Sequence, residues 1–314
     1  MTDCTEISKS KVLVLGGSGF IGKNLCQKLV SIAESVTSLS LSATNIDGVT
    51  DVCASYFNNQ VLEHEVSRHD IIIHLVSTSV PSSADCNVVQ DAQDNLIQTI
   101  KVLDICATQK VKKFIFISSG GTVYGHSPTQ PIKEGADKKP INAYGTCKLA
   151  IENYIDYYSR VYSLDSVILR VANPYGPFQT TNKAQGAVAH FINRILASEN
   201  INIWGDGELI RDYVYIDDVV DAISKSIVYS GESRVFNIGS GIGTSLNQLV
   251  LILERLSGSS VNTLYSNSRK IDVSYNVLNC DLAKRELNWE AKTSLSVGLE
   301  KTLESVKSEK SHSI

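Results

Sequence analysis

Three glycines at three-residue spacing follow the first apolar run of the chain. The segment KVLVLGGSGFIG (11–22) places Gly16, Gly19 and Gly22 between a run of aliphatic residues and a segment with helical apolar spacing. One glycine permits a tight strand-to-helix turn, one lets the backbone approach a pyrophosphate, and one lets the helix pack on the sheet. The start of such a helix offers N–H groups and a positive dipole end to an anion. This unit therefore predicts a dinucleotide-binding turn.

Apolar runs alternate with helical patterns through the first half of the chain. Runs typical of buried parallel strands occupy 11–17, 35–41, 70–77, 112–119 and 166–174. The segment 54–62 predicts a further strand from a weaker pattern. Each run is followed by a segment long enough for a crossover helix, so we predict an α/β fold. The expected architecture is a Rossmann-type, doubly wound parallel sheet with helices on both faces.

The pattern changes after about residue 175. A loop-like segment leads to a helix at 187–197, and 202–228 reads as strand, turn, strand and helix. A strand at 234–241 and an amphipathic helix at 245–256 follow. We therefore predict a dinucleotide-binding domain over 10–174 and a smaller C-terminal α/β substrate lobe mainly over 175–305. Segments near 205–240 are expected to return to the first domain.

Composition narrows the class of protein. The 314 residues carry a net charge of -4, which argues against a nucleic-acid binder that uses a basic face. Seven scattered cysteines without a CxxC pair suit a reducing compartment better than a disulfide framework or a zinc site. The six histidines lack metal-ligand spacing, and the apolar runs are short for a membrane span. We expect a cytoplasmic protein with no metal, nucleic-acid or membrane partner.

The second strand bears on the choice of dinucleotide. A site selective for NAD usually carries Asp or Glu at the end of this strand. Here Ser40 or Ser42 occupies that place, and no Lys or Arg lies between Lys28 and Arg68 to attract the 2′-phosphate of NADP. Both dinucleotides therefore stay open from the residues alone.

The segment YGTCK (144–148) supplies a candidate acid/base pair. The helical pattern of 143–162 puts Tyr144 and Lys148 on one face, about one turn apart. Such a pair is also common on solvated helices, but here a strand ending in hydroxyl residues lies upstream at 112–119. A phenol is a poor base because its pKa is about 10. A neighbouring ammonium and a positively charged cofactor ring would lower the pKa of Tyr144 toward a useful range.

The ordered motifs carry a resemblance. They are GGSGFIG, SSGGTVYG, YGTCK, NPYGP, GDGELIRDYVYIDDVV and RKID, spread over most of the chain. Together they resemble an extended short-chain dehydrogenase/reductase of the NAD-dependent epimerase/dehydratase family. They are most similar to sugar-nucleotide 4-epimerases of the UDP-glucose 4-epimerase type. The resemblance implies NAD (with NADP possible), a nucleotide-sugar substrate and often a homodimer joined by a helix bundle.

Carried over by position, the resemblance assigns roles to residues of this chain. Tyr144 becomes the acid/base and Lys148 its partner. The implied cofactor-binding residues are Gly16, Gly19, Phe20, Ile21, Gly22, Ser40, Leu75, Asn95, Ser118, Tyr144, Lys148 and Pro174. The implied substrate-binding residues are Asn173, Arg211 and Arg269, where the guanidinium groups suit a diphosphate.

One position departs from the family pattern. Such epimerases usually have Ser or Thr three residues before the valine of VYG, where this chain has Gly120. Ser119 or Thr122 would then supply the hydroxyl that binds the reacting group. Strand alternation favours Thr122, since it places this residue on the same face as position 120.

The functional prediction is a nucleotide-sugar epimerase that works at sugar carbon 4 of a UDP-hexose through a transient 4-keto sugar. The alternative is a nucleotide-sugar 4-ketoreductase that consumes NAD(P)H, with a dTDP- or UDP-linked substrate. A third reading is a catalytically silent NAD-binding or regulatory protein. A dehydratase is disfavoured because SSGGTVYG lacks the Asp-Glu pair that such enzymes use.

Overall fold

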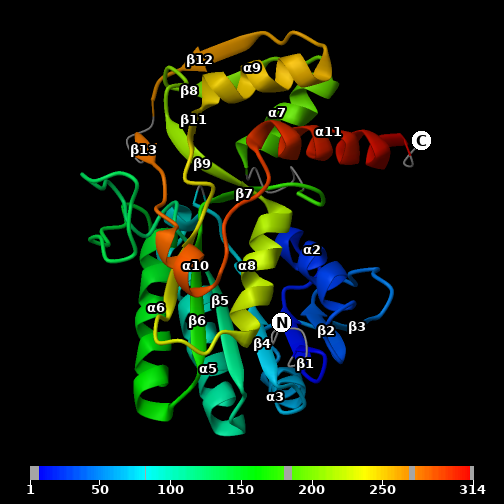
Figure 1. The fold of residues 1–314 in the computed structure, drawn as a ribbon, viewed down its shortest axis with the longest axis vertical. Helices are drawn as coiled ribbons and strands as arrows, with labels where there is room; N and C mark the ends of the chain where they lie inside the picture. The colour runs from blue at the N-terminus through cyan, green and yellow to red at the C-terminus, as the bar shows by residue number, and fades with distance from the viewer. Residues whose placement is uncertain (1–6, 82, 180–185, 269–272, 312–314) are drawn as a thin grey trace.

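A seven-stranded sheet forms the centre of the larger part of the molecule (Figure 1). The computed structural model describes residues 7–81, 83–179, 186–268 and 273–311. The strand order is β10-β6-β5-β4-β1-β2-β3, and every neighbouring pair is parallel. The strands are β1 (Lys11–Leu15), β2 (Ser35–Ser40), β3 (Val49–Cys53), β4 (Ile71–His74), β5 (Lys113–Ser119), β6 (Ser166–Val171) and β10 (Val235–Ile238). The chain winds outward from β1 in both directions, so the carboxyl ends of β1 and β4 border the switch point where such sheets bind ligands.

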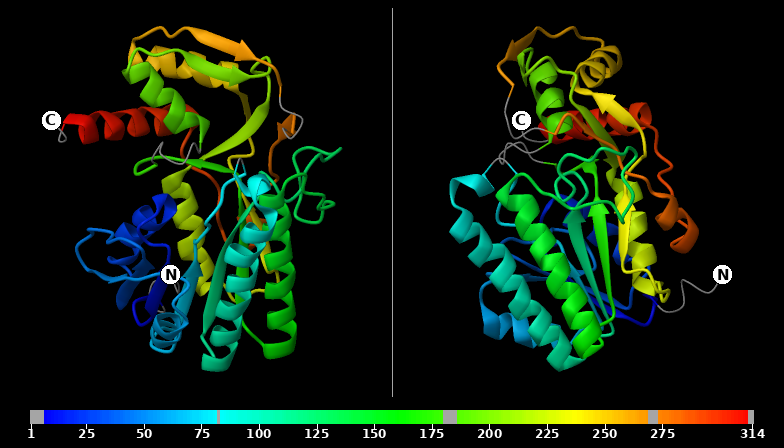
Figure 2. Two further views of the ribbon diagram at one scale, coloured as in Figure 1. Left: turned by 180° about the vertical axis from the view of Figure 1, so that it is seen from behind. Right: turned by 90° about the vertical axis from the view of Figure 1, so that its left-hand side faces the viewer.

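Helices cover both faces of this sheet, as two views at right angles show (Figures 1 and 2). One face carries α2 (Phe20–Leu29) and α8 (Ile216–Val228), and the other carries α3 (Asn59–Val66), α5 (Gln98–Gln109) and α6 (Ala143–Tyr162). Alternate strand residues supply the two cores. Val12 and Val14 of β1 belong to one buried cluster, while Leu13 and Leu15 belong to the other. This is why β1 is apolar without interruption from Val12 to Leu15.

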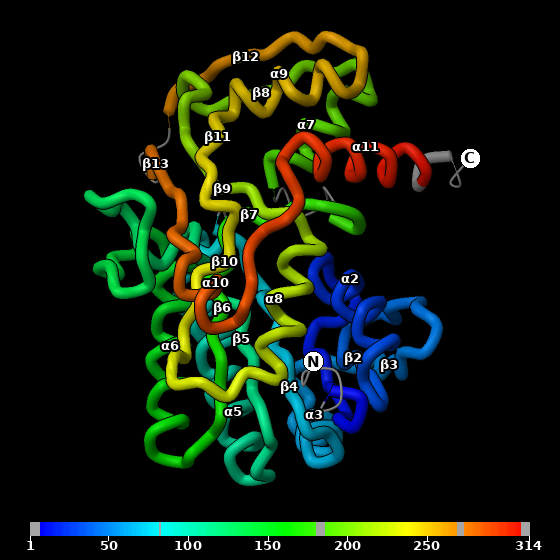
Figure 3. Tube along the Cα trace, viewed as in Figure 1, coloured from blue at the N-terminus to red at the C-terminus, as the bar shows by residue number. Residues whose placement is uncertain are grey.

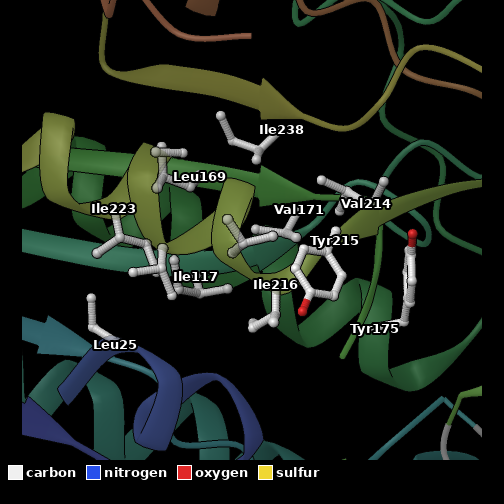
Figure 4. Close-up of a cluster of buried hydrophobic side chains, with 14 of the residues drawn as sticks. Leu25, Ile117, Leu169, Val171, Tyr175, Val214, Tyr215, Ile216, Ile223 and Ile238 are labelled. Carbon is white, nitrogen blue, oxygen red and sulfur yellow. The ribbon is translucent and has the colours of Figure 1, made fainter. Parts of the chain in front are cut away.

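Helix α8 closes one of the two cores. Figure 4 shows Ile216 and Ile223 of α8 against Ile117 of β5 and Leu169 of β6. All four side chains are at most 8% exposed. Burying a branched aliphatic side chain of this size stabilises the fold by about 1.5–3 kcal/mol. The cluster therefore fixes α8, and with it the strand that leads into α8, on the sheet.

The rest of the chain forms a smaller part above the carboxyl ends of the strands, which the tube in Figure 3 follows from residue to residue. One sheet contains β7 (Asn173–Tyr175), β9 (Ile210–Tyr215), β11 (Gly243–Ser245) and β13 (Tyr275–Asn276), and β8 (Ile201–Trp204) pairs with β12 (Thr263–Ser266). The helices of this part are α7 (Ala187–Leu196), α9 (Leu246–Ser257) and α11 (Leu295–Ser311), whereas α10 (Asp281–Glu286) packs against β10 of the main sheet. A capping box of Ser245 and Gln248 begins α9.

The predicted α/β fold with a Rossmann-type parallel sheet is confirmed, and α6 spans the expected residues. Strand β10, at 235–238, pairs with β6 in the main sheet. The predicted strand at 54–62 is wrong. The strand lies earlier, at Val49–Cys53, and the side chain of Asn58 accepts a hydrogen bond from Val61 N at the start of α3. The division at residue 174 stays a prediction. None of the described helices has both the length and the apolar composition needed to cross a membrane.

Gly22→Ala tests the contact between α2 and the preceding turn. A Cβ at Gly22 would lie 2.3 Å from Gly16 O and 2.6 Å from Gly17 Cα. Alanine normally stabilises a helix relative to glycine, but here we expect a loss of about 1–3 kcal/mol of unfolding free energy because the site is overpacked. Chemical denaturation measures this loss. Gly135→Ala is the control, since a Cβ there meets no atom within 4 Å; equal stability of both variants would contradict the prediction.

Candidate active site

The turn between β1 and α2 has the geometry of an anion site. Gly16 has a φ of 90°, which favours glycine, and an added Cβ would press on Val76 at 3.3 Å. Gly19 is the N-cap of α2 and no described side chain caps the helix there. The first N–H groups of α2 are therefore available to an anion at the positive end of the helix dipole. This turn fits the pyrophosphate of a dinucleotide.

Hydroxyl groups from β2 line this turn. Ser40 Oγ accepts a hydrogen bond from Ser18 N at 3.1 Å and lies 3.2 Å from Ser38 Oγ. Ser42 Oγ donates to Ser18 Oγ at 3.3 Å. Ser40 thus binds the glycine turn through Ser18. It stands near the end of the second strand, where sites selective for NAD usually carry Asp or Glu.

The first two turns of α6 hold the predicted acid/base pair. The side chain of Asn142 accepts a hydrogen bond from Gly145 N at 2.8 Å and begins the helix. Lys148 is 6% exposed, and its Nζ donates to Ile117 O at 3.0 Å. The same nitrogen lies 4.6 Å from the centroid of the Phe116 ring and 5.7 Å from that of the half-buried Tyr144. Lys148 is therefore fastened to β5, and Tyr144 stands one turn above it.

Burial shifts the pKa values of the two residues in opposite directions. It raises the pKa of Tyr144 to about 12, although a hydrogen bond from Ser77 acts the other way. Burial also lowers the pKa of Lys148 to about 8. We had expected Lys148 to lower the pKa of Tyr144. That expectation stays a prediction, because it combines the ammonium with a bound cofactor ring. In the protein alone Lys148 donates to a carbonyl of β5, and desolvation disfavours the phenolate.

The loop after β4 and the turn that follows α4 (Val88–Asp91) complete the surroundings of Tyr144. Asn95 lies in the π-helix Ala92–Ile97. Its Oδ1 accepts a hydrogen bond from Thr78 N at 2.9 Å, and its Nδ2 donates to Thr78 Oγ1 at 2.9 Å. It thus pins the loop to the helix. A small pocket is lined by Ser77, Ser79, Asp91, Asn95, Tyr144, Cys147 and Lys148. Sequence patterns pointed to Asn95, Tyr144 and Lys148 but not to the other four.

The hydroxyl residues at the end of β5 differ in whether their side chains are buried in the fold or face the site. Ser118 Oγ donates to Glu152 Oε1 at 2.5 Å, so this hydroxyl is committed to α6. Thr122 Oγ1 is buried without a hydrogen-bond partner among the described residues. Ser119 is only half-buried. Its Oγ and Asn173 Oδ1 each lie 3.9 Å from the point where a Cβ of Gly121 would be, so both face the same space.

Gly120 has a packing role that the sequence did not reveal. A Cβ at this position would lie 2.5 Å from Leu278 Cδ1 and 3.0 Å from Arg170 O. Leu278 is fully buried, and Asn276 Nδ2 donates to Gly120 O at 3.2 Å. The chain near 276–278 therefore covers the end of β5 at the position where the resemblance implies a hydroxyl side chain.

The remaining predicted residues lie along the same edge of the sheet or in the smaller part. Phe20 and Ile21 begin α2, and Leu75 N donates to Leu15 O at 3.0 Å. Pro174 O, in β7, accepts from Gln179 Nε2 at 3.2 Å.

Two of the three predicted substrate residues have described contacts. Asn173 Nδ2 donates to Asp212 O at 2.9 Å, and Arg211 Nη1 donates to Ile210 O and Val273 O at 2.9 and 2.6 Å. Arg269 falls outside the described residues.

Comparison with known proteins identifies the family. The model of the NAD dependent epimerase/dehydratase family matches residues 12–239, well over half of the chain. The chain belongs to this family. It is thus an enzyme of an NAD-dependent family, as the motifs had indicated.

Three known proteins show the range of relatives. The chain is 33% identical to a dTDP-4-dehydro-6-deoxyglucose reductase of Escherichia coli, over 96% of this chain and 99% of the relative. A structure of UDP-glucose 4-epimerase with UDP-glucose from Thermotoga maritima has a TM-score of 0.91 and 36% identity, over 95% of this chain and 99% of that one. The Thermus thermophilus UDP-glucose 4-epimerase with NAD has a TM-score of 0.88 and 26% identity, over 95% and 99%.

Gly120→Ser tests whether position 120 can take the family's usual side chain. The added atoms would meet the buried Leu278, so we expect the variant to lose about 1–3 kcal/mol of unfolding free energy. Thermal and chemical unfolding measure the loss. Gly121→Ser serves as the control, because the nearest atoms to its Cβ are at 3.9 Å. If Gly120→Ser is as stable as the control, the side chain of Leu278 moves aside at little cost, and the prediction is contradicted.

Proposed function

We propose that this enzyme is a nucleotide-sugar 4-epimerase that acts on a UDP-hexose with NAD as its cofactor. The observation that carries the proposal is the position of Tyr144 and Lys148. Lys148 is bound to the main chain of β5, and the glycine turn follows β1 in the same parallel sheet, with β4 between the two strands. Both features lie at the carboxyl edge of the sheet, where folds of this kind bind their ligands. Relatives named UDP-glucose 4-epimerase support a UDP-hexose as the substrate and sugar carbon 4 as the reacting centre.

The residues of this chain would handle protons during the reaction. Tyr144 removes the proton of the hydroxyl at sugar carbon 4 when the sugar is oxidised, and returns it when the 4-keto sugar is reduced. The ammonium of Lys148 stabilises the negative charge that Tyr144 carries between these steps. NAD, when bound, supplies the hydride acceptor and donor, and its positive ring favours the phenolate. Inversion at carbon 4 would require the 4-keto sugar to turn over in the site before Tyr144 returns the proton.

The other site residues belong to the same proposal. The groups proposed to hold the cofactor are Gly16, Gly19, Phe20, Ile21, Gly22, Ser40, Leu75, Asn95, Ser118 and Pro174, and those for the substrate are Asn173, Arg211 and Arg269. For the hydroxyl that binds the reacting group, we favour Ser119. Its Oγ shares a space with the side chain of Asn173, whereas the hydroxyl oxygen of Thr122 is buried.

One observation favours the second candidate, a nucleotide-sugar 4-ketoreductase. A reductase needs Tyr144 as a proton donor, which is the form of a phenol at neutral pH, and burial raises the pKa of Tyr144 further, to about 12. The relative from Escherichia coli is named as a dTDP-4-dehydro-6-deoxyglucose reductase. Because Ser40 does not select against NADP, a reductase could use either reduced dinucleotide.

A substrate panel with Tyr144→Phe tests the function. Purified enzyme is incubated with UDP-, dTDP- and GDP-hexoses, and the products are separated. An epimerase interconverts two hexoses without net change in reduced cofactor, whereas a reductase steadily oxidises NADH or NADPH in the presence of a 4-keto sugar nucleotide. Loss of the phenol should lower turnover by about 10²–10⁴-fold, as for other proton-transfer groups.

The control for this experiment is Tyr154→Phe, which removes an exposed hydroxyl from the same helix. It should keep the activity of the unchanged enzyme. Full activity of Tyr144→Phe would overturn the proposed mechanism, and a protein inactive on every substrate would favour a binding or regulatory role.

We also propose that the enzyme is a cytoplasmic homodimer that serves polysaccharide biosynthesis. Tyr154, Tyr157 and Val161 form an exposed stripe at helical spacing on α6, 40–54% exposed, and Ile97 lies exposed ahead of α5. A bundle of α5 and α6 from two subunits would cover this stripe. The six cysteines of the described residues are all free, which suits a reducing compartment. Nucleotide-activated hexoses are donors for polysaccharide assembly.

Val161→Glu tests the proposed dimer. A charge at Val161, the most exposed residue of the stripe, would be buried on association, so we expect the variant to sediment as a monomer at concentrations where the unchanged protein is a dimer. Leu251→Glu places the same charge at an exposed position of α9 and should leave the dimer intact. A monomeric unchanged protein, or a dimeric Val161→Glu, would contradict the prediction.

A further inference from the structure

A buried carboxylate lies beside the acid/base pair. Asp91, the last residue of α4, is 6% exposed and lines the same pocket as Tyr144 and Lys148. It accepts a short hydrogen bond from the hydroxyl of Ser79. Asn95 Nδ2 donates to Asp91 Oδ1 at 3.0 Å and to its main-chain oxygen at 3.2 Å. The carboxylate is therefore held in one place by two neighbouring segments.

The donors to this carboxylate are neutral groups. Ser79 donates to it from the loop and Asn95 from the π-helix, and Cys147 of α6 lines the same pocket. Withdrawing a carboxylate from water costs several kcal/mol unless a positive charge or several hydrogen bonds compensate it. The ammonium of Lys148, the next residue after Cys147, acts on Asp91 as the opposite charge.

The other charged or titratable groups around Lys148 are already accounted for. Glu152, one turn further along α6, forms a buried ion pair with Arg170 at 2.6 Å. His74 of β4 is fully buried, and burial lowers its pKa to about 3, so it stays neutral. Asp85, before α4, is exposed and accepts a hydrogen bond from Ala143 N. Asp91 is thus the carboxylate at this pocket that faces Tyr144, Cys147 and Lys148 without a guanidinium partner in the part of the chain described.

We propose that Asp91 is a positioning residue of the acid/base pair, whose buried carboxylate orders the loop at Ser79 and sets the charge balance around Tyr144 and Lys148. The role in catalysis rests on the proposed function. The negative charge favours the protonated form of both groups, so it keeps Lys148 as an ammonium. It also opposes the phenolate of Tyr144, in the same direction as burial. The pKa values of Tyr144 and Lys148 should therefore shift in the same direction when this charge is removed.

Asp91→Asn removes the charge and keeps the shape. Loss of a negative charge lowers the pKa of both Tyr144 and Lys148. We expect both limbs of the pH profile of kcat/KM to move to lower pH, each by about one pH unit. A residue that only supports the fold would lower the height of the profile and leave its limbs in place, and that result would overturn the proposal.

The matched control is Asp94→Asn, one turn away. Its carboxylate accepts from Gln90 Nε2 at 2.7 Å on an exposed side of the same helical segment. The same charge is removed, but the limbs of the profile should stay where they are. An equal shift in both variants would mean a general charge effect and would count against a specific role of Asp91.

A second measurement does not depend on any substrate. Lysine labelled at the ε-carbon allows the titration of Lys148 to be followed by NMR in the purified protein. Burial lowers the pKa of Lys148 to about 8, so we expect a midpoint in that range for the unchanged protein. The midpoint should fall in Asp91→Asn and stay in Asp94→Asn. An unchanged midpoint overturns the proposal even if the enzyme is an active epimerase, whereas a lowered midpoint supports it even if the substrate has been assigned wrongly. Should Asp91→Asn fail to fold, Asp91→Ser removes the same charge and must give the same direction.

Discussion

A buried ion pair determines how α6 lies on the sheet. Arg170 of β6 and Glu152 of α6 meet at 2.6 Å with side chains that are each 4% exposed. Glu152 also accepts the hydroxyl of Ser118 from β5, and one turn earlier Lys148 donates to the adjacent Ile117 O. Removal of either partner of a buried pair costs about 3–5 kcal/mol, because the other charge is left without compensation. Successive turns of α6 are thus fixed to β5, and this gives Tyr144 a defined place above the strand end.

The same burial makes the site sensitive to charge. Desolvation raises the pKa of Tyr144 and lowers that of Lys148, since it disfavours the charged form of each. In surroundings of low polarity, an added or removed charge has a large effect on both groups. Proton transfer as we propose it for this site would therefore depend on the whole set of nearby charges, with Asp91 among them, and not on Tyr144 and Lys148 alone.

Local patterns were sufficient for most of the fold and for the centre of the site. Apolar runs and helical spacing predicted the sheet and α6, and the motif YGTCK marked Tyr144 and Lys148. The third strand was misplaced because VTDVC (49–53) is half-exposed and lacks an apolar run. Asp91 and Leu278 could not be found from the sequence. Each reaches the site through contacts with distant segments, and neither stands in a pattern that indicates such a role.

The contact between Leu278 and Gly120 joins two regions that are 158 residues apart in the chain. The end of β5 is thus covered partly by the segment that follows β13, so these two segments must fit each other. Consider a chimera that takes its predicted substrate lobe from a relative with serine at position 120. The residues of that lobe that face the end of β5 would not fit Gly120. Transplanting specificity between such enzymes would require the tip of β5 to be exchanged together with the lobe.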